Sequence, residues 1–353
     1  MAKYLASSLP AGFPPVRKPS PWISSWIRSN GFVLGLFVAV GLEFLFPRLG
    51  SRDGILHPEI LSNIGIAIIL FLQGLSLPWE KVKTGLNDWR LHVITQAFTF
   101  IVFPIVGFVL HLLGPWIWPT DTPAVRDDFL YLCVLPSTIS TSVVLTSVAN
   151  GNTAGALFNA VVSNIAGVII TPLLVHLLMQ ASGHPAPFGP LILKIAVLTL
   201  LPFAIGMILH RPFQAWVYAQ KRWINRISHT IVLFIVYTAF CDSVENRIWA
   251  LYGVSLTIKV LALVVVLFAG MSLLIYATCR FAELNRADAI TAYFCSVKKT
   301  LAMGVPLAVL IFRERTDLSL ILLPTMFYHP FQLFVNGLLA NRWSKFHSEP
   351  SST

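Results

Sequence analysis

Charged residues are scarce in this sequence. They make up 11% of its 353 residues, while 56% are hydrophobic, and soluble proteins carry about 25% charged residues. A soluble protein with so little polar material could not cover its own surface, so the composition indicates an integral membrane protein. Residues 1–28 also lack the short apolar core and small-residue cleavage site of a signal peptide. We therefore expect the first hydrophobic segment to direct membrane insertion.

Motifs for enzymatic chemistry are absent as well. The sequence contains no His-Glu-x-x-His, no Gly-x-Ser-Gly and no aspartate cluster within a hydrophobic segment. Its four cysteines lie in or beside apolar segments without metal-type spacing. We expect a protein that is not an enzyme and has no bound metal or other cofactor. The net charge of +10 reflects mainly the cytoplasmic loops proposed below, so it indicates no nucleic-acid partner.

Long hydrophobic runs dominate what is present. Their number predicts an all-α polytopic membrane protein with one ten-helix domain at residues 30–340, preceded by a disordered tail at 1–29 and followed by a tail at 341–353. We expect membrane lipid around it, and the sequence leaves the oligomeric state open. The ten segments are 31–46, 60–77, 91–113, 129–149, 154–179, 191–210, 224–241, 253–278, 287–312 and 318–339.

Basic residues in the loops predict the orientation. With the N-terminus inside, inside segments carry 15 lysines and arginines and outside loops carry 6. Because basic loops stay on the cytoplasmic side, both termini are expected in the cytoplasm and the protein in the cell (inner) membrane.

The chain also contains a weak internal repeat. An offset of 162 residues aligns CVLPSTISTSVVL, from Cys133, with CSVKKTLAMGVPL, from Cys295. Other segment pairs match in the same order, each five segments apart. Two five-helix halves, at about 30–180 and 190–340, must lie in opposite orientations. This is the inverted repeat of many secondary transporters.

The fourth and ninth segments each have a polar centre. Pro136 removes a backbone donor from the fourth segment, and the hydroxyl residues after it can satisfy freed backbone groups or start a new helix near Thr141. A proline-kinked but continuous helix, with hydroxyls bonded to its own carbonyls, is the alternative. In the ninth segment, Lys298 and Lys299 would lie near the bilayer midplane, where each costs roughly 2.5–3.5 kcal/mol. Their side chains cannot reach either interface, so they must face protein, water or a ligand.

If both segments break and cross, four half-helix ends meet at the midplane. The carbonyl ends favour a cation, which a lysine ammonium supplies, and the amide ends favour an anion. We therefore predict a site for a small organic anion with lysine as counter-charge. The predicted substrate-binding residues are Lys298, Lys299, Thr300, Ser137, Thr138, Thr141 and Ser142. A second set of ion or polar-site candidates is Ser140, Ser296, Gln73, Asn159 and Asn164, for which hydrogen bonding between helices is the simpler explanation.

These features resemble a known family. The ten-segment plan, PSTISTSVVLTSVANGN in segment four and YFCSVKKTLAMGVPLA in segment nine are similar to the bile acid:sodium symporter (solute carrier 10) superfamily. The likeness is strongest to its divergent YfeH-like branch, which includes the seventh human member, and extends over residues 31–339. It implies a panel domain, a core domain in which segments four and nine cross, and a transport role.

The sodium ligands of that family are not retained. Where family members have Gly-Gly-Thr-Ala-Ser-Asn after the proline, Ser137 and Thr138 replace the glycines, and Thr141 and Ser142 stand in the Ser-Asn places. The family's Glu and Gln from segment nine are absent, and that region offers two lysines and a serine. Two positive charges disfavour a pair of bound sodium ions.

The leading hypothesis from the sequence is a secondary transporter of a small organic anion that works by alternating access, with lysine in place of sodium. Two alternatives stay open: a membrane regulator of calcium homeostasis without flux of its own, and a sodium-coupled organic anion symporter. Substrate identity and coupling ion lie beyond the sequence.

Overall fold

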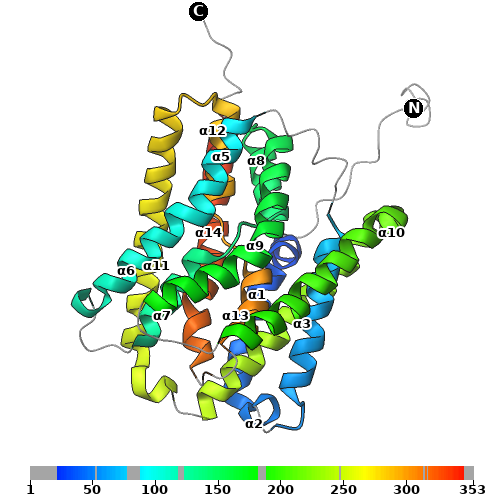
Figure 1. Ribbon diagram of the computed structural model, residues 1–353, viewed down its shortest axis with the longest axis vertical. Helices are drawn as coiled ribbons and strands as arrows, with labels where there is room; N and C mark the ends of the chain where they lie inside the picture. The colour runs from blue at the N-terminus through cyan, green and yellow to red at the C-terminus, as the bar shows by residue number, and fades with distance from the viewer. Residues whose placement is uncertain are drawn as a thin grey trace, which may run out of the picture.

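The computed structural model describes residues 22–51, 54–77, 88–117, 123–181, 188–245, 248–312, 315 and 317–345. All regular secondary structure in these residues is helical (Figure 1). The predicted tails lie largely outside them, although the first helix begins at Trp22 and the last ends at Lys345. The elements are α1 (Trp22–Leu45), α2 (Pro47–Gly50), α3 (Pro58–Leu75), α5 (Trp89–Ala97), the π-helical η2 (Phe98–Val102), α6 (Phe103–Ile117), α7 (Pro123–Val134), α8 (Ser140–Val148), α9 (Thr153–Ala181), α10 (Phe188–Glu245), α11 (Ile248–Phe281), α12 (Arg286–Ser296), α13 (Leu301–Ile311) and α14 (Leu318–Lys345).

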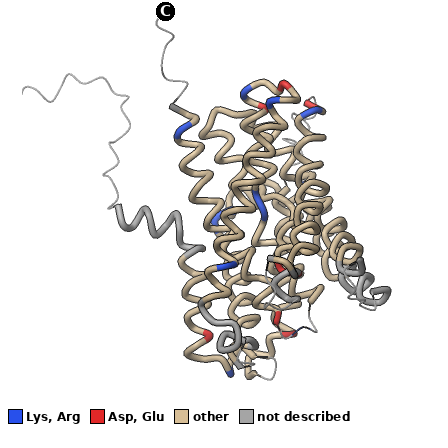
Figure 2. The backbone as a smooth tube through the Cα atoms, turned by 90° about the vertical axis from the view of Figure 1, so that its left-hand side faces the viewer, with Lys and Arg blue, Asp and Glu red and all other residues tan. Residues whose placement is uncertain are grey.

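Seven helical runs among the described residues are long and apolar enough to cross a membrane. Charged residues lie mostly toward the two ends of the bundle (Figure 2), as expected when the middle faces hydrocarbon. The protein is therefore an integral membrane protein. These seven runs do not confirm ten separate spans. The first predicted segment contains a shorter apolar helix (Leu34–Leu45), the fourth is divided into α7 and α8, and the sixth and seventh form the single element α10.

The single helical element α10 differs from the prediction of separate sixth and seventh segments. The expected connection at 211–223 holds no glycine, and its one proline, Pro212, removes a single helical hydrogen bond without ending the helix. On α10, Gly206 lies against α3 at Phe71, and Ile231 lies against α3 at Gly65. A straight helix would separate the two α10 residues by about 38 Å, but their contacts on α3 lie only about 9 Å apart. The element therefore bends back along α3.

The helices form two groups. In one, α1, α2 and α3 pack on α10; in the other, α5, α8, α9, α11 and α14 pack around α7 and α12. Helix α13 lies between the groups, against α10, α3 and α14. Figure 1 shows α3 and α10 on one side of the molecule and α11 on the other. The largest hydrophobic cluster extends through both groups and includes fully buried Phe103, Leu135 and Tyr328.

The fourth and ninth predicted segments are both interrupted. Non-helical residues 135–139 separate α7 from α8, and residues 297–300 separate α12 from α13. The first break contains Pro136 and the second contains both lysines. A continuous, kinked helix is therefore excluded at both places.

Candidate functional site at the helix crossing

The two breaks touch each other directly. The Thr300 backbone N–H donates to the Pro136 carbonyl at 3.0 Å. The Ser137 hydroxyl donates to the Cys295 carbonyl at 2.6 Å, and the Ser142 hydroxyl donates to the Phe294 carbonyl at 3.3 Å. Each bond supplies a partner for a backbone group that is left unpaired where a helix begins or ends. The predicted crossing is therefore held by backbone groups and hydroxyls of the predicted residues.

Side chains of α9 satisfy much of the first break. The Asn164 side-chain amide donates to the Ser137 carbonyl at 2.9 Å, and Ser163 Oγ accepts from the Ser137 N–H at 3.0 Å. The Thr171 hydroxyl donates to the Val134 carbonyl at 2.9 Å. Buried backbone groups are costly when unpaired, so these hydrogen bonds from α9 stabilise the break.

Helix α14 supports the second break in the same way. The Gln332 side chain accepts from the Lys299 N–H at 2.9 Å and donates to the Lys299 carbonyl at 2.8 Å. The Tyr328 hydroxyl donates to the Val297 carbonyl at 2.7 Å. Gln332 and Tyr328 are not among the residues predicted from the sequence, because polar residues within one apolar helix do not indicate which distant backbone they contact.

The Lys299 ammonium lies on the carbonyl end of α7. Its Nζ donates to the carbonyls of Leu135 at 2.7 Å, Cys133 at 2.9 Å and Thr99 at 3.3 Å. It also lies 4.1 Å from the centre of the Phe103 ring. A helix end rich in unpaired carbonyls is a cation site, and this one is filled by a covalently held cation. From the sequence we predicted a cation at the carbonyl ends of the broken helices, but placed it at the end of the first half of the ninth segment itself.

The Thr99 carbonyl is free to accept this bond because of a local distortion in the third segment. Within η2, the Phe103 N–H bonds to the Phe98 carbonyl, one residue earlier than in an α-helix. The next residue, Pro104, has no N–H to offer. The Thr99 carbonyl is thereby left without these helical partners. Pro104 is the one feature of the sequence that indicates an unpaired carbonyl at Thr99.

Lys298 has a different environment from its neighbour. Its side chain is fully buried, and its Nζ has no hydrogen-bond partner among the described residues. The Ser296 hydroxyl is likewise buried and unpartnered. A buried polar group without a partner is costly and requires an explanation. Lys298 is therefore the strongest ligand-facing candidate in the crossing.

Three hydroxyls gather at the start of α8. Thr138 Oγ1 lies 2.7 Å from Thr141 Oγ1 and 3.2 Å from Ser142 Oγ. The N-cap residues of α8 and α13, Ile139 and Thr300, make no side-chain hydrogen bond to the turn that follows. Uncapped helix N-termini present N–H groups and a positive partial charge, which suit an anion.

The other candidates are more dispersed. Ser140 is exposed. Asn159 bonds to the Gln96 side chain at 3.1 Å and the His92 ring at 2.9 Å, linking α9 to α5. Gln73 lies on α3 in the other helix group, with its Oε1 buried and unpartnered. Asn159 thus fits the interhelical explanation.

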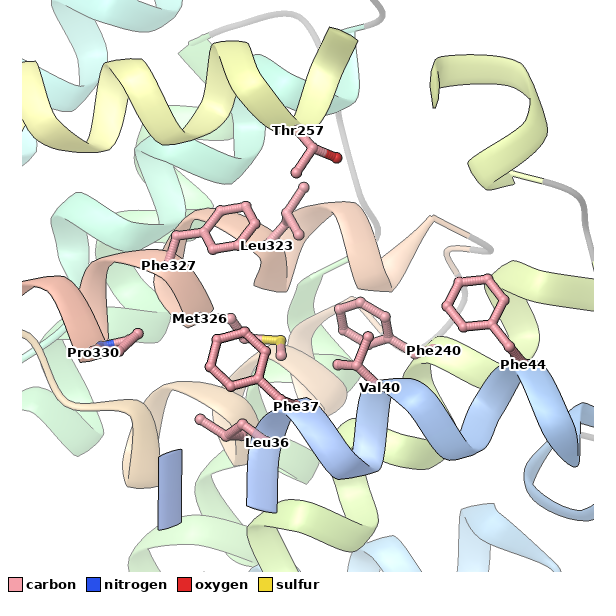
Figure 3. A pocket seen from close by; sticks show the side chains of 10 residues that line it. All are labelled: Leu36, Phe37, Val40, Phe44, Phe240, Thr257, Leu323, Met326, Phe327 and Pro330. Atoms are coloured by element: carbon pink, nitrogen blue, oxygen red, sulfur yellow. The ribbon is translucent and has the colours of Figure 1, made fainter. Parts of the chain in front are cut away.

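An apolar cavity of about 210 Å³ lies between the two helix groups (Figure 3). Val40 and Phe44 of α1 and Phe240 of α10 form one side, while Phe327 and Pro330 of α14 form another. Thr257 alone contributes a hydroxyl among the lining residues. This lining suits hydrocarbon and offers no counter-charge to an anion.

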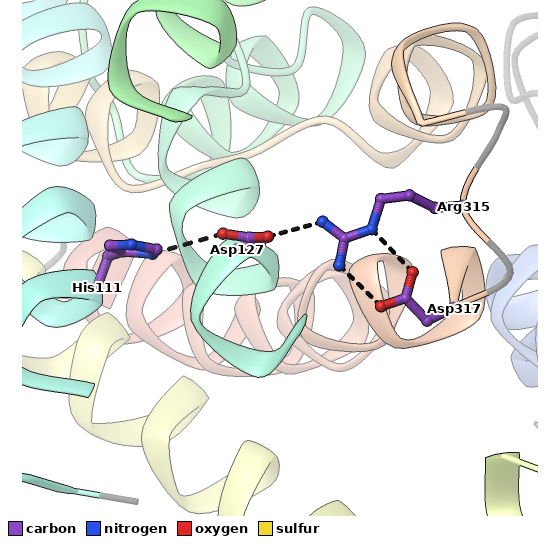
Figure 4. A network of polar contacts seen from close by, with 4 residues as sticks. All are labelled: His111, Asp127, Arg315 and Asp317. Carbon is purple, nitrogen blue, oxygen red and sulfur yellow. Dashed lines mark hydrogen bonds and ion pairs between the residues drawn. The ribbon is translucent and has the colours of Figure 1, made fainter. Parts of the chain in front are cut away.

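Polar contacts also connect the outer ends of the broken helices. Arg315, between α13 and α14, donates to Asp127 of α7 and to Asp317, both at 2.7 Å, and His111 of α6 lies 3.5 Å from Asp127 (Figure 4). Burial lowers the pKa of Arg315, but the carboxylates of Asp317 and Asp127 outweigh this effect and raise it. The guanidinium therefore stays charged and ties the loop after α13 to α7.

A second set of contacts holds the start of α12. The Asn152 side-chain amide, in the loop after α8, donates to Asp288 of α12 and to Asp88, both at 2.8 Å. The Thr291 hydroxyl adds a bond to the Asn152 carbonyl at 3.1 Å. Each broken helix is thus tied at its start to the loop that follows the other one.

Comparison with known proteins agrees with this geometry. The model of the SBF-like CPA transporter family matches residues 30–345. The chain belongs to this family. It is 36% identical to "Putative symporter YfeH" of Escherichia coli (strain K12) over 316 residues, which are 89% of this chain and 92% of that protein. It is 31% identical to "Sodium/bile acid cotransporter 7" of Xenopus tropicalis (89% and 91%) and 32% identical to that of Rattus norvegicus (89% and 92%). These names support the predicted resemblance and a secondary transport role.

Proposed function

We propose that this protein is a secondary transporter of a small organic anion that works by alternating access, with a lysine in place of the sodium sites. The observation that carries this proposal is the contrast between two adjacent buried lysines. The Lys299 ammonium is bonded to three backbone carbonyls, whereas Lys298 Nζ has no hydrogen-bond partner among the described residues. One basic side chain is used by the fold, and the other is left for a ligand.

Lys299 supports the absence of a sodium ion at the crossing. Backbone carbonyls of broken helices coordinate sodium in many transporters, and here the ammonium of Lys299 binds such carbonyls. A sodium ion placed at the same oxygens would meet both a steric clash and a like charge. Transport that continues without sodium follows from this arrangement.

Lys298 and the uncapped starts of α8 and α13 support an anionic substrate. An ammonium group and free helix N–H groups both favour negative charge. No carboxylate bonded to Lys298 occurs among the described residues. A small anion with a carboxylate or similar group supplies the missing partner.

The architecture we propose is five helices plus five in opposite orientations, with both termini in the cytoplasm of an inner-membrane protein. The reciprocal contacts described above support it. Asp127 at the start of α7 binds Arg315, and Asp288 at the start of α12 binds Asn152. Reciprocal contacts of this kind are expected when two similar halves are related by a two-fold axis in the membrane plane.

The first test measures the thermal stability of the purified protein against a panel of organic anions, in sodium and in choline buffer. An anion at 100 times its dissociation constant adds about 2.7 kcal/mol of stability. We expect this gain in both buffers and its loss in Lys298→Met, with Lys221→Met, on an exposed part of α10, as control. Stabilisation only in sodium would favour the sodium-coupled alternative.

A second variant tests the exchange of lysine for sodium. Lys299→Ala removes the ammonium and leaves space beside the carbonyls of Thr99, Cys133 and Leu135. We expect sodium, and not choline, to restore part of the lost stability. Uptake into proteoliposomes then decides between transport and regulation, since a regulator without flux shows none for any anion of the panel.

A further inference from the structure

The strongest unexplained feature of the molecule is the unpartnered nitrogen of Lys298. The side chain is 0% exposed, whereas the equally buried Lys299 has three acceptors. Both lysines lie in the same four-residue break, so chain position does not explain the difference. The two lysines differ in the hydrogen-bond partners of their side-chain nitrogens.

An ammonium group is poorly accommodated at Lys298 in this conformation. A buried charge without a counter-ion or acceptor costs several kcal/mol, and a buried group avoids this cost by becoming neutral. The titratable groups whose charges reach Lys298 are the Cys295 thiol on α12 and the His329 ring on α14, beside the cation of Lys299. None of these three is a carboxylate.

The acidic residues of the surrounding elements lie toward the outer ends of their helices. Asp127 and Asp128 of α7 lie about 9 to 11 Å along that helix from its last residue, Val134. Asp288, with Asp88 of the α5 end beside it, lies at the opposite end of α12, about 12 Å from its last turn. Glu43 of α1 lies about 16 Å along that helix from Phe32, which packs against His329. Lys298 therefore has no built-in counter-charge among the described residues.

The surroundings of Lys298 include the boundary between the two helix groups. The His329 ring lies edge-on to Phe32 of α1 at 6.0 Å, and Phe32 stacks on His229 of α10 at 4.3 Å. His329 Nδ1 also lies 3.2 Å from Gln332 Nε2. Separation of α1 and α10 from α14 would uncover this side of the crossing. Access to Lys298 is thereby linked to movement between the groups.

We propose that Lys298 couples transport to protons: it is a neutral amine in the empty, closed site and takes up one proton together with one substrate anion. This inference rests on the proposed function and names its coupling ion. The amine binds a proton to become an ammonium, which pairs with the anion, and both leave on the other side. The pair carries no net charge for a monovalent anion, and the lysine returns neutral.

Linked binding of proton and anion fixes the direction in which anion affinity changes with pH. Because proton and anion bind together, each favours the other. Anion affinity falls by about tenfold for each unit of rising pH once the empty site is neutral. Arginine stays charged throughout, so Lys298→Arg removes the pH dependence while it keeps a positive group in the site.

The decisive experiment observes the lysine side-chain nitrogens directly, by solid-state NMR of the isotope-labelled protein in lipid. Without an anion, from neutral to mildly alkaline pH, we expect one neutral amine signal. It should disappear in Lys298→Arg, persist in Lys299→Arg, and convert to an ammonium signal at lower pH. A Lys298 signal that is ammonium at every pH would overturn the proposal, because no proton would then be exchanged.

Flux measurements separate this inference from the proposed function. Proteoliposomes that take up an anion of the panel should acidify inside during uptake, and a protonophore should abolish accumulation driven by a pH gradient. Uptake without proton movement sinks proton coupling and leaves anion transport standing. No uptake of any anion, with a neutral Lys298 signal present, contradicts the proposed function instead.

Discussion

The two helix breaks solve the same backbone problem in different ways. At the first, between α7 and α8, the carbonyls of residues 133–137 all find partners: Lys299 Nζ, the Thr171 hydroxyl, the Thr300 N–H and the Asn164 amide. At the second, between α12 and α13, the backbones of Val297, Lys299 and Thr300 are also bonded, but the Lys298 amine and the Ser296 hydroxyl have no hydrogen-bond partner in the described part of the chain. The first break thus pairs these carbonyls within the protein, whereas we propose that a ligand completes the second.

The supporting helices show the same difference. On α9, Ser163, Asn164 and Thr171 all bond to the first break. On α14, Gln332 bonds to the second break, but Thr325 and Asn336, seven residues before it and four after it on the same helix face, are buried without a hydrogen-bond partner among the described residues. Because native proteins rarely bury polar groups unpaired, this asymmetry supports the proposal of a functional surface on the α14 side.

The largest expected effect separates the two lysines. Lys299→Met leaves three carbonyls without their ammonium, and we expect it to lower the free energy of unfolding by about 2–4 kcal/mol. Lys298→Met removes a buried nitrogen that has no hydrogen-bond partner in the described residues, and it should raise stability by about 1–3 kcal/mol. Reversible unfolding in mixed detergent micelles measures both. Equal losses would show that the lysines are not distinct.

The sequence predicted the breaks because their causes are local. Pro136 removes a donor, the hydroxyls after it are helix-starting residues, and two lysines at mid-membrane depth cannot continue an apolar helix facing lipid. Ser137, Thr138, Ser142 and Thr300 do lie at the crossing. These predictions needed only residue types and their depth in the membrane.

The sequence could not predict the partners of each group. Lys299 bonds to carbonyls 164 to 200 residues away, and backbone carbonyls are the same for every residue type. The Thr99 carbonyl is available only because a π-helical turn precedes Pro104, and Gln332 is one of several polar residues on α14. The two adjacent lysines differ in their tertiary contacts, which residue types do not reveal, so both received the same predicted role.

The next prediction compares the amides that support the breaks. Gln332→Leu leaves both the N–H and the carbonyl of Lys299 unpaired, and should cost about 2 kcal/mol. Asn164→Leu leaves only the Ser137 carbonyl unpaired, because the Ala160 carbonyl that Asn164 also contacts lies within helix α9. We expect about half the loss, measured by the same unfolding assay. A larger loss for Asn164→Leu would reverse the order of support.

The smallest effect gives the sharpest test, because its two variants are chemically identical. Thr171 and Thr325 are both buried, at 0% and 1% exposure, and lie on α9 and α14, the two helices that support the breaks. Thr171→Val keeps the shape but removes the bond to the Val134 carbonyl, at a cost of about 1 kcal/mol.

Thr325→Val removes a hydroxyl for which the described part of the chain offers no hydrogen-bond partner. Stability should stay equal or rise slightly, since an unpaired buried hydroxyl is itself unfavourable. If the α14 side is the functional surface, this stable variant should lose anion affinity, and Thr171→Val should keep it. Unfolding and anion-binding assays on both proteins measure the two effects separately. Loss of binding in Thr171→Val with normal binding in Thr325→Val would assign the ligand to the α9 side and contradict the comparison of the breaks.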